Sequence, residues 1–187
     1  MQHKTHTFGR NLLRYSAIAI ALASPALVAQ SDPKFGISAS VAMPMGSLSD
    51  VAGPGFSVGA FYEMPLFEGL VQNMSVQYTS FGTKKTEISY IYSSYSFDTS
   101  VSSFSAHYDL NYYLGPSLYA LAGLSYHSYS VTVKGGGISI SSDIGEIDTK
   151  AALNIGGGFN LTQSFGIEGK FVLAGDPFLQ LSARLRF

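Results

Sequence analysis

The last ten residues, 178–187, read FLQLSARLRF, and their alternation decides the fold. Apolar side chains fall at every second position: Leu179, Leu181, Ala183, Leu185 and Phe187. Arg184 and Arg186 lie between them. Because successive side chains of a β-strand point to opposite faces, the segment predicts a strand with one apolar face and one face that carries two guanidinium groups.

The same period of two recurs from Phe35 to the last residue, and helical spacing never replaces it for more than a few positions. Eight segments show it most clearly: 35–43, 56–64, 74–81, 102–114, 118–131, 151–161, 165–173 and 178–187. A strand of about ten residues, tilted by about 40°, covers roughly 25 Å, which is the height of the apolar band around an outer-membrane barrel.

The connections between these segments alternate in length. In chain order they are 44–55 (long), 65–72 (intermediate), 82–100 (long), 115–117 (tight), 132–150 (long), 162–164 (tight) and 174–177 (short). Apart from the last, the long connections fall at one end of the strand array and the shorter ones at the other. Short periplasmic turns and long outer loops give this pattern in membrane barrels.

Residues 1–29 have the layout of a secretory signal peptide, because three basic residues precede the apolar run 17–28, which ends in small residues. We expect cleavage after Ala29, with 24–26 as a second candidate site, and a barrel domain over 30–187. A short N-terminal anchor is the alternative interpretation. Removal of the peptide leaves eight basic against twelve acidic residues, a net charge of −4, which argues against a nucleic-acid partner.

One face of the expected strands is apolar, and the other is small or polar throughout. A soluble β-sandwich would turn the apolar face inward, whereas a membrane barrel turns it outward. The signal peptide favours lipid, and so do the aromatic side chains of Tyr112, Phe165 and Phe187 at the expected periplasmic ends. The Ser/Tyr-rich segment 84–100 suggests a hairpin that continues beyond the membrane. We therefore predict an all-β fold, an eight-stranded antiparallel up-and-down transmembrane β-barrel.

The chain resembles the small outer-membrane β-barrel domain family, the porin-like and opacity-like relatives of OmpX and of the OmpA barrel. The resemblance rests on FGISASVAMPMG (35–46), LGPSLYALAGLSY (114–126), ALNIGGGFNLTQSFGIEGKF (152–171) and the terminal phenylalanine. It implies export through the periplasm to the outer membrane of a Gram-negative-type bacterium, with outer-membrane lipid as surroundings. It also implies that the barrel assembly machinery reads the alternating residues of the last strand, Leu181, Ala183, Leu185 and Phe187.

Eight strands enclose an interior just wide enough for side chains to fill, so we expect a filled polar lumen. Its charges are three acidic and three basic residues: Glu63, Asp109, Glu168, Lys170, Arg184 and Arg186. Burying any of them without a partner is costly, so we expect ion pairs. The last connection, if it pairs Leu173 with Leu179, fixes the register of the final two strands. Glu168 then faces Arg184.

The glycine run 156–158 has two interpretations. The turn at 162–164 places Gly158 beside Glu168 and Gly156 beside Lys170, so the glycines would leave room for long charged side chains. Alternatively, the run marks a kink or a bulge in the strand.

Serine and histidine alternate on two neighbouring strands. The pattern is formed by Ser105, His107, Ser125 and His127, and the tight turn at 115–117 sets His107 opposite Ser125 and Ser105 opposite His127. With Asp109 to orient a histidine, such pairs could support nucleophilic catalysis, and some outer-membrane barrels modify lipid A. These pairs point into the lumen, however, so we interpret them as a hydrogen-bond ladder.

No metal or other cofactor is expected, because the chain has no cysteine and keeps only two histidines after cleavage. The leading hypothesis is a non-enzymatic outer-membrane barrel with a structural or surface-interaction role, in which its outer loops could meet a surface ligand. The alternatives are a narrow channel for small or apolar solutes, a lipid A-modifying enzyme and a soluble secreted β-domain.

Overall fold

The computed structural model describes residues 32–90, 93–135, 138–142 and 150–187, so the predicted signal peptide lies outside the described residues. The elements in chain order are β1 (Lys34–Pro44), α2 (Leu48–Val51), β2 (Ala52–Phe67), β3 (Leu70–Tyr90), β4 (Ser93–Tyr113), β5 (Leu118–Gly135), β6 (Ile138–Ser142), β7 (Lys150–Asn160), β8 (Phe165–Leu173) and β9 (Phe178–Arg186). None of the described helices has the length and hydropathy needed to cross a membrane.

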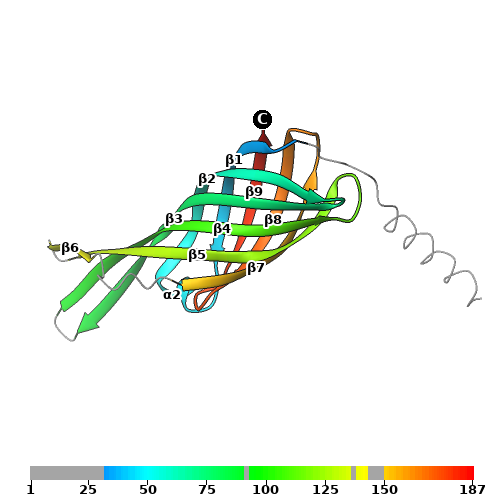
Figure 1. Ribbon diagram of the computed structural model, residues 1–187. Helices are drawn as coiled ribbons and strands as arrows, with labels where there is room; N and C mark the ends of the chain where they lie inside the picture. Colours follow the sequence, from blue (N-terminus) through cyan, green and yellow to red (C-terminus); the bar gives the residue numbers. More distant parts are fainter. Residues whose placement is uncertain (1–31, 91–92, 136–137, 143–149) are drawn as a thin grey trace, which may run out of the picture.

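The strands close into a ring (Figure 1). Each of β1 to β5 pairs antiparallel with the next, β5 pairs with β7, and β7, β8 and β9 follow in order until β9 pairs with β1. The short β6 pairs with the far end of β5, residues 131–135, beyond the stretch of β5 that pairs with β7. The ring therefore has eight positions, which confirms the predicted up-and-down barrel.

Alternation sorts the side chains as predicted. On β9, Arg184 and Arg186 are 2% and 3% exposed, whereas Leu181 and Leu185 are 48% and 39% exposed. The other strands repeat this division, so the outer wall is apolar and most of the inner wall is polar. Arg184 and Arg186 thus lie inside the lumen, away from the apolar outer wall.

The strands β3, β4 and β5, with 21, 21 and 18 residues, are longer than a membrane crossing requires. Pairing of β2 with β3 ends at Ala52 and Thr83, but β3 and β4 stay paired as far as Tyr90 and Ser93. Most of connection 82–100 is thus a hairpin, which confirms the expected continuation beyond the membrane. The register between β3 and β4 shifts between Ser80 and Lys84, at the point where this hairpin leaves the ring.

The intermediate connection expected at 65–72 is a two-residue turn. Phe67 pairs directly with Leu70, and Gly69 between them has φ +76°, a left-handed conformation that glycine adopts without a Cβ penalty. The strands β2 and β3 therefore reach further toward this end than alternation alone indicated.

The inner face was expected to be small or polar throughout, and the structure shows that it is not. At the end of the lumen nearest α2 it holds an apolar cluster, which we call the outer plug: Ala42, Leu48, Ala52, Phe81, Val101, Ala152, Val172 and Phe178. These residues continue the inward face of their strands, as Val172 follows Lys170 and Phe178 precedes Gln180. The polar part of the inward face stops short of this end, where inward apolar side chains pack against each other and against Leu48 of α2.

Candidate functional site

The described charges of the lumen form two ion-paired groups, which together we call the charged network. Glu63 of β2 is fully buried and receives both arginines of β9, with Arg186 Nε at 2.7 Å and Arg184 Nη2 at 2.9 Å from its carboxylate oxygens. Each of the six predicted lumen charges takes part in at least one ion pair. Three acids and three bases thus balance to zero net charge inside the barrel.

Arg184 also pairs with Glu168, but not as the expected cross-strand neighbour. Glu168 lies opposite Ser182, so the register of β8 and β9 differs by two residues from the prediction. The difference arises at the last connection, where Val172 pairs with Phe178 across residues 173–177, rather than Leu173 with Leu179 across residues 174–178. An even shift keeps every side chain on its face, and the long guanidinium side chain reaches Glu168 along the diagonal.

Two aromatic side chains complete the surroundings of Arg184. Its guanidinium carbon lies 4.0 Å above the centre of the Phe61 ring, a cation–π contact. The hydroxyl of Tyr119 donates a hydrogen bond to Glu168 Oε2 at 2.8 Å. The sequence analysis assigned no role to either residue, although their positions in the alternation place both on the inward face.

The glycine run leaves space, but partly for a different side chain. The register places Gly158 opposite Glu168 and Gly156 opposite Lys170, as predicted. A Cβ at Gly158 would collide with the ring of Tyr119 rather than with the carboxylate. Neighbouring β7 and β8 stay in regular register through the run, so it marks no bulge.

A second part of the network surrounds Asp109. Lys170 Nζ lies 3.1 Å from Asp109 Oδ2, and the side-chain amide of Asn154 donates to Oδ1 at 2.7 Å. A Cβ at Gly123 on the adjacent strand would collide with this carboxylate, so glycine is required there. Asn154 was missed by the sequence analysis, although it lies on the inward face two residues before Gly156.

The serine–histidine ladder forms, with its hydrogen bonds along each strand. Ser105 Oγ lies 2.9 Å from His107 Nε2, and Ser125 Oγ lies 2.9 Å from His127 Nε2. The two imidazole rings meet edge to face at 5.3 Å between centres. Cross-strand neighbours are those predicted from the tight turn at 115–117.

Among the residues that the structure describes, no carboxylate forms a hydrogen bond with either imidazole of the ladder, as nucleophilic catalysis by these pairs would need. His107 Nδ1 faces Lys170 Nζ at 3.4 Å and Asn154 Nδ2 at 3.3 Å, while Asp109 is occupied by those same two groups. All four ladder residues are buried under the outer plug. Within the described part of the chain, no group of three or more histidine or acidic side chains is placed to hold a metal ion.

The outer plug is built from packed rings and covered by a loop. Phe178 contacts Phe81 edge to face at 5.8 Å and His127 at 5.7 Å. Leu48 of α2 joins these rings from above. Below the plug, a polar cavity of about 20 Å³ beside Arg184 is large enough for one water molecule.

Hydrogen bonds between connections hold this cover in place. Asp176 accepts from Ser47 at 2.6 Å and pairs with Lys150 at 2.7 Å, and the backbone N–H of Met45 donates to the carbonyl of Pro177 at 2.9 Å. The hydrogen bonds from Lys150 and Ser47 lower the pKa of Asp176 below its usual 3.8. We call these contacts the loop latch.

The last strand closes the ring with its apolar residues outward. Leu181, Ala183, Leu185 and Phe187 all face away from the lumen, and the backbone N–H of Phe187 donates to the carbonyl of Phe35 at 2.8 Å. Tyr112 and Phe165 are exposed at the same end. Recognition of this strand by the assembly machinery stays a prediction.

Comparisons with known proteins gave likeness in structure only. No family model matches the chain, and no curated protein matches it. Among solved structures, Neisserial surface protein A (NspA) is similar at 18% identity and a TM-score of 0.49 over 82% of this chain and 95% of that one. A de novo designed transmembrane β-barrel is similar at 7% identity and a TM-score of 0.46, over 82% of this chain and 95% of that one. Ail of Yersinia pestis, in complex with the heparin analogue sucrose octasulfate, is similar at 19% identity and a TM-score of 0.43, over 83% of this chain and 96% of that one.

The closed ring itself decides what surrounds the protein. Exposed aliphatic and aromatic side chains cover the outside of every strand in the ring, while ion-paired acids and bases lie inside. Water around the wall would leave this belt exposed, and hydrocarbon would bury it. A wall of this kind is stable only in a bilayer, so the chain is a small eight-stranded transmembrane β-barrel of the outer-membrane type.

Proposed function

We propose that this protein is a non-enzymatic component of a Gram-negative-type outer membrane, exported through the periplasm, and that it acts by binding other polypeptides outside the membrane. The sheet that projects from the ring is the binding element. The barrel below it serves as a rigid support that fixes the sheet at the cell surface.

The state of the lumen supports a non-conducting, non-catalytic barrel. The charged network fills one half, and the outer plug closes the other. The cavity beside Arg184 and Lys170 has room for a single water molecule. The serine–histidine ladder lies below the plug, and no described carboxylate forms a hydrogen bond with its imidazole nitrogens.

The observation that carries the proposal is the free edge of the projecting sheet. Beyond Thr83, β3 has β4 on one side and no described strand on the other, so the backbone from Lys84 to Tyr90 forms an edge (Figure 1). The outer parts of β4, β5 and β6 extend the same sheet. Such an edge offers unpaired N–H and C=O groups, which can add an extended segment of another chain as a further strand.

The test removes the edge and keeps the ring. An Asn-Gly turn replaces residues 86–97, so that the paired residues Lys85 and Asp98 flank a two-residue hairpin. Cells that display the full chain are compared with cells that display the shortened chain for adhesion to a surface coated with synthetic peptides of high β-strand propensity, which can pair with a free edge. We expect adhesion by the full chain and its loss on shortening.

A charge variant separates backbone pairing from simple electrostatic attraction. Lys85→Glu keeps the hairpin and reverses an exposed charge at its base. Binding through the backbone edge should survive this change. Equal adhesion by full and shortened chains, with both barrels folded, would show that the projecting sheet is not the binding element.

A further inference from the structure

The free edge of β3 is closed at the end nearest the membrane. β2 pairs with β3 as far as Ala52 and Thr83, so a strand added beside Lys84 lies in line with β2 and meets it end to end. The short helix α2 directly precedes β2 and lies at the same corner, because Lys84 Nζ donates to the carbonyl of Ser49 at 2.5 Å. An added strand must therefore stop or turn away at Lys84.

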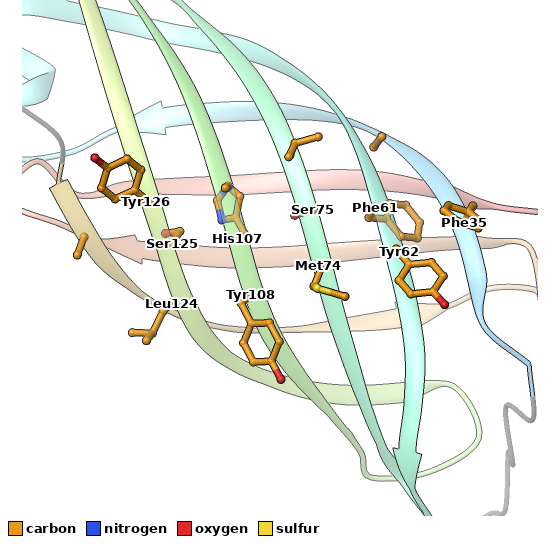
Figure 2. Close-up of a pocket in the computed structure, with 14 residues that line it drawn as sticks. Phe35, Phe61, Tyr62, Met74, Ser75, His107, Tyr108, Leu124, Ser125 and Tyr126 are labelled. Atoms are coloured by element: carbon orange, nitrogen blue, oxygen red, sulfur yellow. The ribbon is translucent and has the colours of Figure 1, made fainter. Parts of the chain in front are cut away.

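Two lysines lie at this closed end, on opposite faces of the sheet. Successive side chains of a strand alternate between faces, as Figure 2 shows on β4, where Tyr108 points to the outer wall and His107 to the lumen. Lys84 and Lys85 are consecutive residues of β3, and both are exposed. The end of an added strand would therefore lie between two ammonium groups.

The described charge at this corner is positive. Lys85 pairs with Asp98 of β4, which pairs with Lys134 of β5, so this row carries one net positive charge. Lys84 adds a third base and Asp50 of α2 a second acid, so the sum of three bases and two acids is again +1. A carboxylate is favoured at this end of the edge, and a further ammonium group is disfavoured.

Charge and chain direction together select the end of the partner that binds. β3 runs outward from the ring, so a strand antiparallel to it runs toward the membrane and brings its C-terminal end to Lys84 and Lys85. A parallel strand would bring an ammonium terminus to these lysines. Its carboxylate end would lie toward the tip, where Glu87 adds an acid to the edge. The antiparallel direction is therefore favoured.

We propose that the edge of β3 binds the C-terminal end of another polypeptide, added antiparallel, with its terminal carboxylate between Lys84 and Lys85. Residues 84–90 are available, and at about 3.4 Å per residue they accept roughly 24 Å of extended chain. A chain that continues has to turn away from β2 and α2, whereas a chain that ends there does not. This inference rests on the proposed function and names the part of the partner that the projecting sheet binds.

The test compares peptides that differ only at the C-terminus. A peptide of about eight residues, alternately valine and threonine, carries a neutral fluorophore on its N-terminus and ends in either a free carboxylate or an amide. Each form is titrated with the refolded full chain in nonionic detergent micelles, and fluorescence anisotropy reports binding. We expect the free carboxylate to bind about three- to fivefold more tightly at low salt, and the difference to shrink at high salt. Equal affinity of the two forms for the full chain would overturn the inference.

Variants locate the carboxylate. Lys84→Met with Lys85→Met removes both charges and should bring the two affinities together. Lys134→Met, at an exposed lysine of β5 in the same sheet, is the matched control and should keep the preference. A preference of the same size in the double variant would refute the proposed position. Heat-modifiable gel mobility reports closed barrels, and Lys85→Met alone replaces the double variant if that one does not fold.

The shortened chain separates this inference from the function on which it rests. With residues 86–97 replaced by Asn-Gly, the two lysines remain but the edge is gone, so both peptides should lose binding. If neither peptide binds the full chain, or if both bind the shortened chain equally well, the proposed function fails and the inference fails with it. If both bind the full chain alone and with equal affinity, the proposed function stands and the terminal carboxylate plays no part.

Discussion

Arg184 shows at the scale of one residue how the lumen tolerates charge. Its guanidinium joins Glu63 of β2 to Glu168 of β8 and rests on the ring of Phe61. A planar group with five N–H donors can serve two carboxylates at once, which a lysine ammonium does with less geometric control. Three strands are thereby linked through one side chain.

Replacement of Arg184 by leucine should destabilise the barrel strongly. The change leaves Glu168 with Tyr119 as its remaining hydrogen-bond partner in a buried site. Breaking a buried pair typically costs about 3–5 kcal/mol. Urea unfolding of the refolded protein, followed by tyrosine fluorescence and gel mobility, measures the loss.

The paired carboxylate gives the matched control for this prediction. Glu168→Gln combined with Arg184→Leu removes the orphaned charge and should recover at least about 1 kcal/mol. Lys85→Leu, at an exposed position beyond the ring, should change the free energy of unfolding by no more than about 0.5 kcal/mol. A double variant no more stable than Arg184→Leu alone would mean that the two side chains are not coupled.

Gly158, on the inward face of β7, and Gly169, on the outward face of β8, should respond differently to substitution. Gly158→Val forces a side chain into the ring of Tyr119 and should cost about 1–3 kcal/mol. Gly169→Ala meets only Leu181 Cδ2, at 3.4 Å, and should stay within about 0.5 kcal/mol of the parent. Similar unfolding midpoints in urea for both variants would contradict the packing described for Tyr119.

At the scale of elements, the loop latch ties three connections over the outer plug. Asp176 in the β8–β9 connection joins Ser47, just before α2, to Lys150 at the start of β7. Lys84 of β3 adds a hydrogen bond to the carbonyl of Ser49 at 2.5 Å. The short helix therefore stays above the plug although it has only one turn.

The latch should contribute stability that depends on pH. The folded pKa of Asp176 lies below its usual 3.8, so the contribution is fully present above that value and is lost as the pH falls through the folded pKa. At pH 7, Asp176→Asn should cost about 0.2–1 kcal/mol, and the difference from the parent should shrink below about pH 4. Asp50→Asn, at an exposed acid of α2, is the control and should show little effect at pH 7. A difference that persists unchanged to pH 2 would exclude the carboxylate as its source.

The elements also show what alternation can and cannot predict. It located all eight ring positions and both faces, because a period of two determines which side each residue takes. It did not determine how far β3 and β4 run beyond the ring, since polar hairpins in water lack an apolar face to mark their length. The offset of β8 against β9 depended on the loop at 173–177, which periodicity does not encode. The partners of Asp109 on β4 are Asn154 of β7 and Lys170 of β8, and the pairwise registers of neighbouring strands do not reveal such a cluster.

For the whole molecule, the filled lumen predicts an electrically silent protein. Purified barrel in a planar bilayer at about 100 mV should give no reproducible conductance steps, because the space beside Arg184 holds about one water molecule and the plug closes the outer end. Regular steps that scale with protein concentration would show that the lumen opens. A boiled sample serves as the control for contaminating pores.

Substitution of Phe187 should affect insertion into the outer membrane in cells more than it affects the stability of the refolded protein. The side chain of Phe187 is 73% exposed, so Phe187→Ala should shift the stability of refolded protein by no more than about 1 kcal/mol. If the terminal pattern is read during insertion, the same variant should reach the outer membrane at a reduced level in cells. Leu114→Ala, an outward residue at the same end but outside β9, is the control. Equal reduction of both variants in cells would remove the special role of the last strand.

Ring closure also governs when the interior becomes neutral. The partners that neutralise Glu63 both belong to β9, which is the strand that seals the seam against β1. An open sheet that lacks β9 would hold Glu63 and Glu168 without their arginines, in a space too dry to solvate them. Unpaired carboxylates therefore raise the free energy of a partial barrel until β9 pairs with β1, so electrostatics favours the complete ring over any open form.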